Sequence, residues 1–122
     1  MKNLGKTYFA LALLLLLAGM MQGFWMGATN ALQYKDTHVA ILLPGFVLMA
    51  VFGTIYRLWP RLETAALAKV QFALSAGGAA LMIAGTLQQA LTGSVAIVAT
   101  GSAVAILGVA LMAWLFFTAS EA

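Results

Sequence analysis

Residues 37–58 have the sequence THVAILLPGFVLMAVFGTIYRL, with one charged side chain, Arg57, close to the end of the stretch. A helix of about 20 apolar residues crosses the hydrocarbon core of a bilayer, so this stretch is long enough for one membrane span. Three further stretches have the same character, at residues 8–28, 64–89 and 94–118. The sequence therefore predicts an all-α membrane protein with four transmembrane helices.

The composition agrees with this interpretation. Hydrophobic residues make up 64% of the 122 residues and charged residues only 7%, whereas a soluble domain has about 25% charged residues. The connections expected at residues 29–36, 59–63 and 90–93 are short, and short connections make consecutive helices run antiparallel. Residues 1–122 are therefore expected to form one transmembrane domain, an antiparallel arc or bundle. The first apolar run is longer than the core of a signal peptide, so we expect a retained span.

Positive charges gather on one side of the predicted spans, and only Lys35 falls on the other side. The residues on the shared side are Lys2, Lys6, Arg57, Arg61 and Lys69. Lysine and arginine mark the cytoplasmic side of membrane proteins. This asymmetry predicts that both termini are cytoplasmic, in a bacterial inner membrane. The net charge of +3 is too small and too scattered to suggest a nucleic-acid partner.

The end of the second predicted span has the residues expected at a membrane–water interface. Tyr56 and Trp59 suit the headgroup layer, and Arg57 and Arg61 can extend their charged groups to water. We therefore predict that these four residues anchor the span. Pro44 lies inside the same span and lacks a backbone N–H, so we expect a kink there.

Glycines occur in all four predicted spans, and in the first span they recur every four residues. Small residues let transmembrane helices approach closely, because lipid provides no hydrophobic force between helices. Four helices need fewer glycine-rich faces than these for packing within one chain, so some of these faces are expected to contact another subunit. The glycines assigned to helix packing or an oligomer interface are Gly19, Gly23, Gly27, Gly78, Gly85, Gly101 and Gly108.

Few residues have side chains that could catalyse a reaction or bind a cofactor or a metal. His38 is the single histidine, and a neutral imidazole nitrogen can bind haem or a metal; the alternative is a histidine hydrogen-bonded to a nearby loop. Gln22 lies within the first span, where a polar side chain needs a partner, so we expect an interhelical hydrogen bond. The acids Asp36, Glu63 and Glu121 all lie at predicted membrane edges and form no acid–base pair. No catalytic residue and no metal site is predicted.

Three motifs go beyond general membrane patterning. HVA at residues 38–40 opens the second predicted span, GTIYRLWPR at residues 53–61 closes it, and KVQF at residues 69–72 begins the third. These motifs resemble the C-terminal third of subunit I of the haem-copper oxidases, and above all its small four-helix relatives. The resemblance covers residues 8–117, which correspond to the last four of twelve family helices. It is specific around residues 38–72.

The resemblance implies a four-helix arc with cytoplasmic ends and a haem ligand at His38. Several family features are absent, however. Ala40 stands where the family has a second haem-ligating histidine, and Leu91-Thr92-Gly93 replaces the arginine pair that holds the haem propionates. The copper ligands of the family belong to helices that have no counterpart here. Oxygen reduction by this chain alone is therefore not expected.

Two functions follow as hypotheses. The first is a non-catalytic membrane scaffold or accessory subunit, assembling with itself or within an electron-transfer complex. The alternative is a b-type haem protein that transfers electrons or senses a gas, with His38 as axial ligand. An ion channel would need charged residues in mid-membrane, and the predicted spans offer none there. Because the twelve family helices form three similar arcs, the resemblance implies a homotrimer, with a dimer or docking onto a larger complex as rivals.

Overall fold

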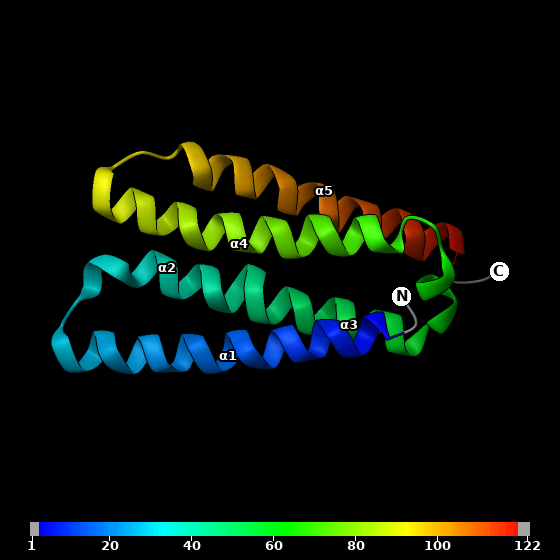
Figure 1. Cartoon of the computed structure of the whole chain (residues 1–122), viewed down its shortest axis with the longest axis horizontal. Helices are drawn as coiled ribbons and strands as arrows, with labels where there is room; N and C mark the ends of the chain where they lie inside the picture. Colours follow the sequence, from blue (N-terminus) through cyan, green and yellow to red (C-terminus); the bar gives the residue numbers. More distant parts are fainter. Residues whose placement is uncertain (1–2, 120–122) are drawn as a thin grey trace.

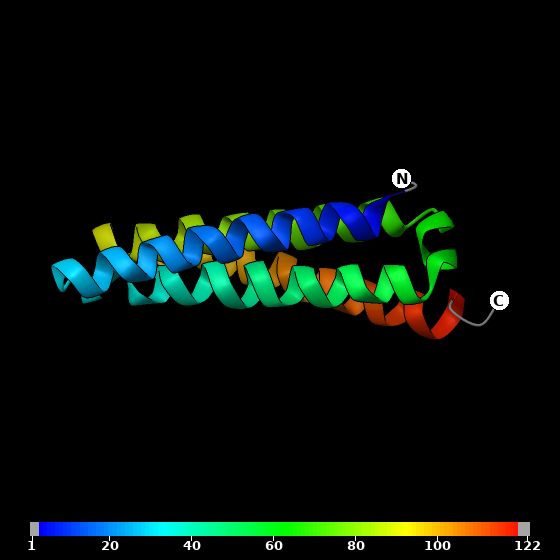
Figure 2. The same cartoon turned by 90° about the horizontal axis from the view of Figure 1, so that it is seen from below.

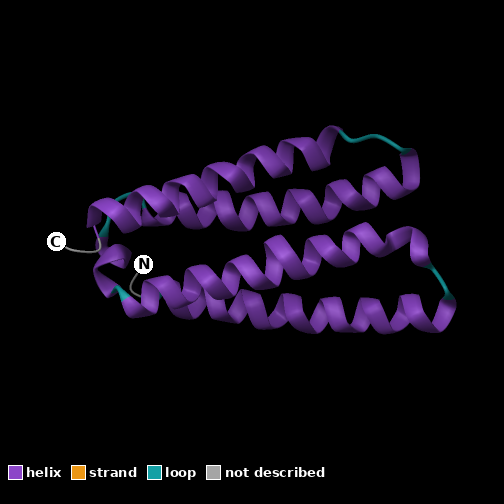
Figure 3. Cartoon of the chain, turned by 180° about the vertical axis from the view of Figure 1, so that it is seen from behind, coloured by secondary structure: helices purple, strands orange, loops and turns teal. Residues whose placement is uncertain are grey.

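The computed structural model describes residues 3–119, and nearly all of these residues are helical, with no strand among them (Figure 3). Four helical stretches are long and apolar enough to cross a membrane, by length and composition: Leu4–Thr29, Leu32–Leu58, Ala68–Thr92 and Ala96–Ala119. They confirm the predicted all-α class and make the chain a multi-pass membrane protein. Lys2 and Glu121, two charged residues considered above, lie outside the described residues.

The helices are labelled in Figure 1. The first span is α1 (Leu4–Thr29). The second span is a continuous series of segments: η1 (Leu32–Tyr34), α2 (Lys35–Ala40), η2 (Ile41–Val47) and α3 (Leu48–Leu58). A short turn, η3 (Pro60–Thr64), then leads to the last two spans, which are α4 (Ala68–Thr92) and α5 (Ala96–Ala119).

The first helix begins earlier than predicted, at Leu4 rather than at residue 8. Its first turn is held against η3, because the backbone N–H of Gly5 donates to Oε1 of Glu63 at 2.8 Å. The first N–H groups of a helix have no intrahelical partner, and a carboxylate also complements the positive end of the helix dipole. A contact between residues far apart in the sequence thus helps to set where α1 begins.

The third span, α4, begins later than predicted, at Ala68 rather than at residue 64. Residues 60–64 form instead the tight turn η3, whose Leu62 is fully buried. The helix ends at Thr92, and its capping residue Gly93 has a φ of 78°. This left-handed conformation suits glycine, because it has no Cβ, and it is the usual way in which a helix gives way to a turn.

The second span is irregular around Pro44. Residues Ile41–Val47 form a wider π-helical segment between two α-helical parts. Proline cannot donate the hydrogen bond that an α-helix requires, and π-helical insertions are one of the few causes of helix kinks. A kink was predicted at Pro44, and the helix is irregular there.

Two helical hairpins lie side by side (Figure 1): α1 with α2 and α3, and α4 with α5. The order across the molecule follows the order along the chain, and both ends of the described chain lie at the same end of the bundle. The view from below shows α1 and α4 in one layer and α3 and α5 in the other (Figure 2). The spans thus alternate between two layers.

The buried core is concentrated towards the end of the bundle where α1 begins and α3 ends. Its members are Leu4, Tyr8, Ala12, Met49, Phe52, Tyr56, Leu62, Ala68, Ala79, Met112 and Leu115. Large apolar side chains also point outwards, and Phe24 and Phe117 are 80% and 78% exposed. Such surfaces are unfavourable in water and favourable in hydrocarbon, in agreement with a membrane location.

Candidate functional site

Gln71, on α4, is the buried polar residue that connects all four spans. Its Oε1 accepts hydrogen bonds from the hydroxyl groups of Tyr8 on α1 at 2.6 Å and Tyr56 on α3 at 3.0 Å. Its Nε2 donates to Oγ of Ser75 at 2.8 Å and to the carbonyl oxygen of Gly108 on α5 at 3.2 Å. We call these five residues the Gln71 centre.

Aromatic rings surround the Gln71 centre. Tyr8 stacks on Tyr56 with 5.7 Å between ring centroids, and it meets Phe52 and Phe72 edge to face at 5.7 Å and 5.0 Å. Such ring pairs add to the stability gained from burial alone. Gly53 makes this approach of α1 and α3 feasible, because a Cβ there would lie 3.1 Å from Cβ of Tyr8.

Gly53, Tyr56 and Gln71, from two of the three motifs quoted for the family resemblance, therefore lie in the packing centre of the bundle. Tyr56 was predicted to anchor in the headgroup layer, and this prediction is wrong, because its side chain is fully buried. The physical reason is that Gln71 offers its hydroxyl group an acceptor inside the bundle. Trp59 is half-buried, with its ring 4.9 Å from that of Phe116. Arg57 and Arg61 are exposed.

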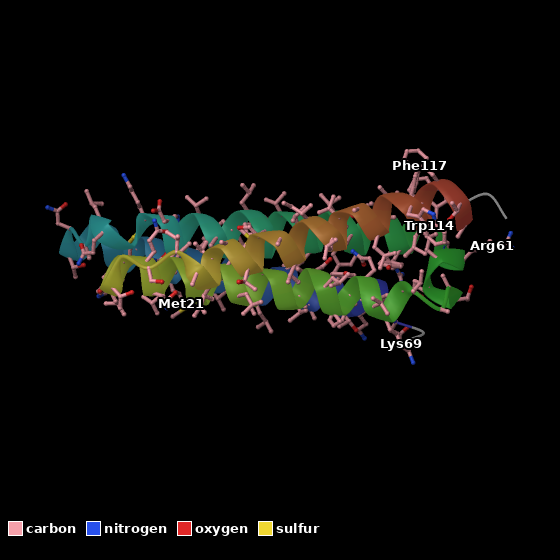
Figure 4. All side chains as sticks on the ribbon, turned by 90° about the horizontal axis from the view of Figure 1, so that it is seen from above. Met21, Arg61, Lys69, Trp114 and Phe117 are labelled. Carbon is pink, nitrogen blue, oxygen red and sulfur yellow. The ribbon has the colours of Figure 1, made fainter. Side chains whose placement is uncertain are left out.

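Aromatic residues other than the predicted anchors Tyr56 and Trp59 lie near the ends of the bundle. Trp114 and Phe117 are exposed and lie at the same end as Arg61 and Lys69 (Figure 4). At the end where α1 finishes, Trp25 lies against Tyr34 with 5.8 Å between ring centroids. Tryptophan and tyrosine favour membrane–water interfaces, so the positions of Trp25, Tyr34 and Trp114 near helix ends indicate interfacial anchors.

His38 is held by Gln22. The imidazole Nδ1 lies 3.0 Å from Oε1 of Gln22, and Nε2 of Gln22 donates to the carbonyl oxygen of Tyr34 at 3.2 Å. Because the amide oxygen can only accept, Nδ1 of His38 carries the hydrogen and Nε2 is the nitrogen with a free lone pair. The interhelical hydrogen bond predicted for Gln22 is therefore confirmed.

The surroundings of His38 bear on haem binding. The ring is half-buried and lies over Gly23, where a Cβ would be 2.8 Å from Cε1 of the imidazole. A neighbouring cleft of about 270 Å³ is lined by Gln22, Trp25, Tyr34, Thr37, Leu87 and Leu91, without His38. This volume is below the roughly 300–1,000 Å³ of small-molecule sites. The cleft is too small for a haem.

No other cluster suggests chemistry. Among residues 3–119, no three histidine, cysteine, aspartate or glutamate residues are grouped so that they could hold a metal ion. Every buried side-chain nitrogen or oxygen in this part of the chain has a hydrogen-bond partner. A second polar link between the hairpins joins Oγ1 of Thr86 on α4 to Oγ1 of Thr37 on α2 at 3.0 Å. The buried polar groups therefore connect helices.

Four of the predicted packing glycines lie between α4 and α5: Gly78, Gly85, Gly101 and Gly108. A Cβ on Gly78 would lie 2.7 Å from the backbone nitrogen of Ala105, and one on Gly101 would lie 2.7 Å from that of Met82. These distances are too short for any real side chain, so the glycines let the two helix backbones approach closely.

In the first hairpin, Gly19 lies against Leu42 and Gly23 against His38, whereas Gly27 has no neighbour within 4 Å of an added Cβ. Contacts inside one chain thus account for every predicted glycine except Gly27. The glycines therefore do not require a second subunit to cover them.

Comparison with known proteins adds no relative, because no family model, curated protein or solved structure matches the chain. The resemblance to subunit I of the haem-copper oxidases rests on the quoted motifs alone.

Proposed function

We propose that this chain is a non-catalytic scaffold or accessory subunit of a bacterial inner membrane. The observation that supports this proposal best is that the buried polar side chains form hydrogen bonds between helices. The Gln71 centre and the Thr37–Thr86 pair direct their hydrogen bonds to neighbouring helices. Side chains engaged in this way stabilise the arrangement of helices and are not free to act on a substrate.

The proposed assembly is a homo-oligomer or a larger electron-transfer complex. A trimer is the favoured number, because the resemblance implies that four helices form one third of a closed ring. The orientation proposed is both termini in the cytoplasm. Arg61 and Lys69 lie at one end of the bundle (Figure 4), where α1 begins with Lys6 and α3 ends with Arg57, and Lys35 belongs to the opposite end.

Mass measurement of the full chain in lipid nanodiscs tests the assembly. We expect a particle with three times the 12.8 kDa mass of one chain, or a complex with other membrane proteins when the protein is extracted from its native membrane. A single chain that is recovered without partners from both preparations would contradict the scaffold proposal.

A b-type haem protein is the second candidate. The hydrogen bond from Nδ1 of His38 to Gln22 favours it, because ligating histidines are usually oriented by such a bond. The absorption spectrum of the purified protein is the test. A Soret band that disappears in the His38→Ala variant is expected for this candidate, and a colourless protein after growth with ample haem would reject it.

A further inference from the structure

A long apolar groove runs between the second span and α5. Its wider part has a volume of about 600 Å³ and the adjoining part about 460 Å³. Leu48 and Val109 line both parts, so the groove is continuous along the bundle. The rest of its lining is also almost entirely apolar, with Ser102 as the exception.

The groove opens sideways, where a membrane protein meets lipid. Leu43, Val51 and Ile106 line it and are each about half exposed or more. Apolar side chains beside an empty space lose their van der Waals contacts. In a bilayer, the material next to this opening is hydrocarbon.

One part of the groove has the length of a lipid leaflet. It extends along α3 from Leu48 to Trp59, a distance of about 16 Å at 1.5 Å per residue. The hydrocarbon core of a bilayer is about 30 Å thick, so one leaflet contributes about 15 Å. A lipid chain that enters beside Trp59 would reach the middle of the membrane at Leu48.

The same end of the bundle carries an excess of positive charge, since four cations face one acid, Glu63, among the described residues. Lys6, Arg57, Arg61 and Lys69 form no ion pair with an acid among residues 3–119, and Oε1 of Glu63 accepts the N–H of Gly5. Arg61 follows Trp59 by two residues and is exposed. A phosphate group above the groove opening would therefore lie within reach of the Arg61 guanidinium.

We propose that this groove binds an acyl chain of an anionic glycerophospholipid, whose phosphate interacts with Arg61. The lipid comes from the leaflet at the positively charged end of the bundle. The proposal requires a membrane location of the chain but neither the scaffold function nor haem binding. A partner helix in the groove would be a different occupant, and the experiment separates the two.

Quenching of Trp59 fluorescence by brominated lipids tests the proposal. Trp25 and Trp114 are replaced by phenylalanine in the full chain, so that Trp59, which lines the groove, is the remaining tryptophan. The protein is reconstituted in vesicles with equal fractions of phosphatidylglycerol and phosphatidylcholine, one of them brominated in its acyl chains. We expect a preference of about fivefold for phosphatidylglycerol, the effect of one arginine at an anionic lipid surface.

Two pairs of variants locate the site. Arg61→Gln should abolish the preference, whereas Lys35→Gln at the other end should retain it. Ala113→Leu narrows the groove and should reduce quenching by phosphatidylglycerol to the level seen with phosphatidylcholine. Ala103→Leu makes the same change at another exposed position of α5, outside the groove lining, and should have no effect.

Two results would overturn the proposal. Equal quenching by both lipids would show that Trp59 meets only unselected bulk lipid. Absence of quenching by either lipid would show that protein, for example a second copy, covers the groove. If the variants do not fold, native mass spectrometry of the unmodified chain from mixed nanodiscs provides the answer, since retained phosphatidylglycerol is expected and its absence excludes the site.

Discussion

Gln71 is the residue on which the contact between the two hairpins most depends. It is fully buried and contacts Tyr8, Tyr56, Ser75 and Gly108 through hydrogen bonds. In hydrocarbon an unpaired polar group finds no water to replace a lost partner. The two tyrosine hydroxyl groups share one acceptor and Gly108 accepts from the same side chain, so a change at Gln71 affects all four spans at once.

Replacing Gln71 with leucine removes this acceptor at little change in volume. We expect the free energy of unfolding to fall by about 1–3 kcal/mol, because two buried hydroxyl groups lose their partner. Denaturation by sodium dodecyl sulfate in lipid bicelles measures it. Gln89→Leu, on the exposed side of the same helix, should change stability by less than about 0.5 kcal/mol. Equal losses in both variants would contradict the role of the Gln71 centre.

Glu63 acts at the start of α1 through its bond to the N–H of Gly5. Glu63→Ala should lower the free energy of unfolding by about 0.5–2 kcal/mol, the usual effect of losing a helix cap. Glu63→Gln keeps an acceptor oxygen and loses only the charge, so a smaller loss is expected. Hydrogen exchange of the first turn of α1, measured by mass spectrometry, should be faster in the alanine variant. Unchanged exchange would show that Glu63 does not hold this turn.

At the scale of the helices, the close pairing of α4 with α5 depends on where glycine faces the neighbouring backbone. Gly77 and Gly78 are adjacent on α4, yet a Cβ on Gly77 would meet nothing within 4 Å. This contrast provides a test in which position is the only variable.

Gly78→Ala should destabilise the protein by about 1–3 kcal/mol, since the new methyl group would force the backbones apart. Gly77→Ala should leave stability unchanged or raise it by up to about 1 kcal/mol, because alanine favours the helix. Thermal unfolding in detergent measures both variants. A destabilising Gly77→Ala together with a neutral Gly78→Ala would mean that a different face of α4 contacts α5.

For the whole molecule, the distribution of charge predicts the orientation in the membrane. Single cysteines can be introduced cleanly, because the natural chain has none. The variants are Gln33→Cys, in η1 at the start of the second span, and Ala66→Cys, in the turn before α4. Both positions are exposed and belong to opposite ends of the bundle. A membrane-impermeant maleimide added to cells with a permeable outer membrane should label Cys at position 33 only. Labelling at position 66 without disruption of the inner membrane would reverse the proposed orientation.

The number of spans, their approximate limits and the Gln22 hydrogen bond could be predicted from the sequence, and the kink predicted at Pro44 corresponds to a π-helical segment. The burial of Tyr56 could not be predicted from the sequence. In a soluble protein, alternation of apolar and polar residues shows which side of a helix is buried. In a span, both the lipid-facing and the buried side are apolar, so Tyr56 gave no sign that it faces Gln71.

The sequence by itself determined that the chain forms four apolar helices joined by short turns, because those properties follow from composition over about 20 neighbouring residues. Only the tertiary structure decided that Tyr8, Tyr56 and Gln71 meet, that most glycines are used inside one chain, and that a groove remains between α3 and α5. These features arise from contacts between distant residues, and hydropathy does not specify which apolar faces come together.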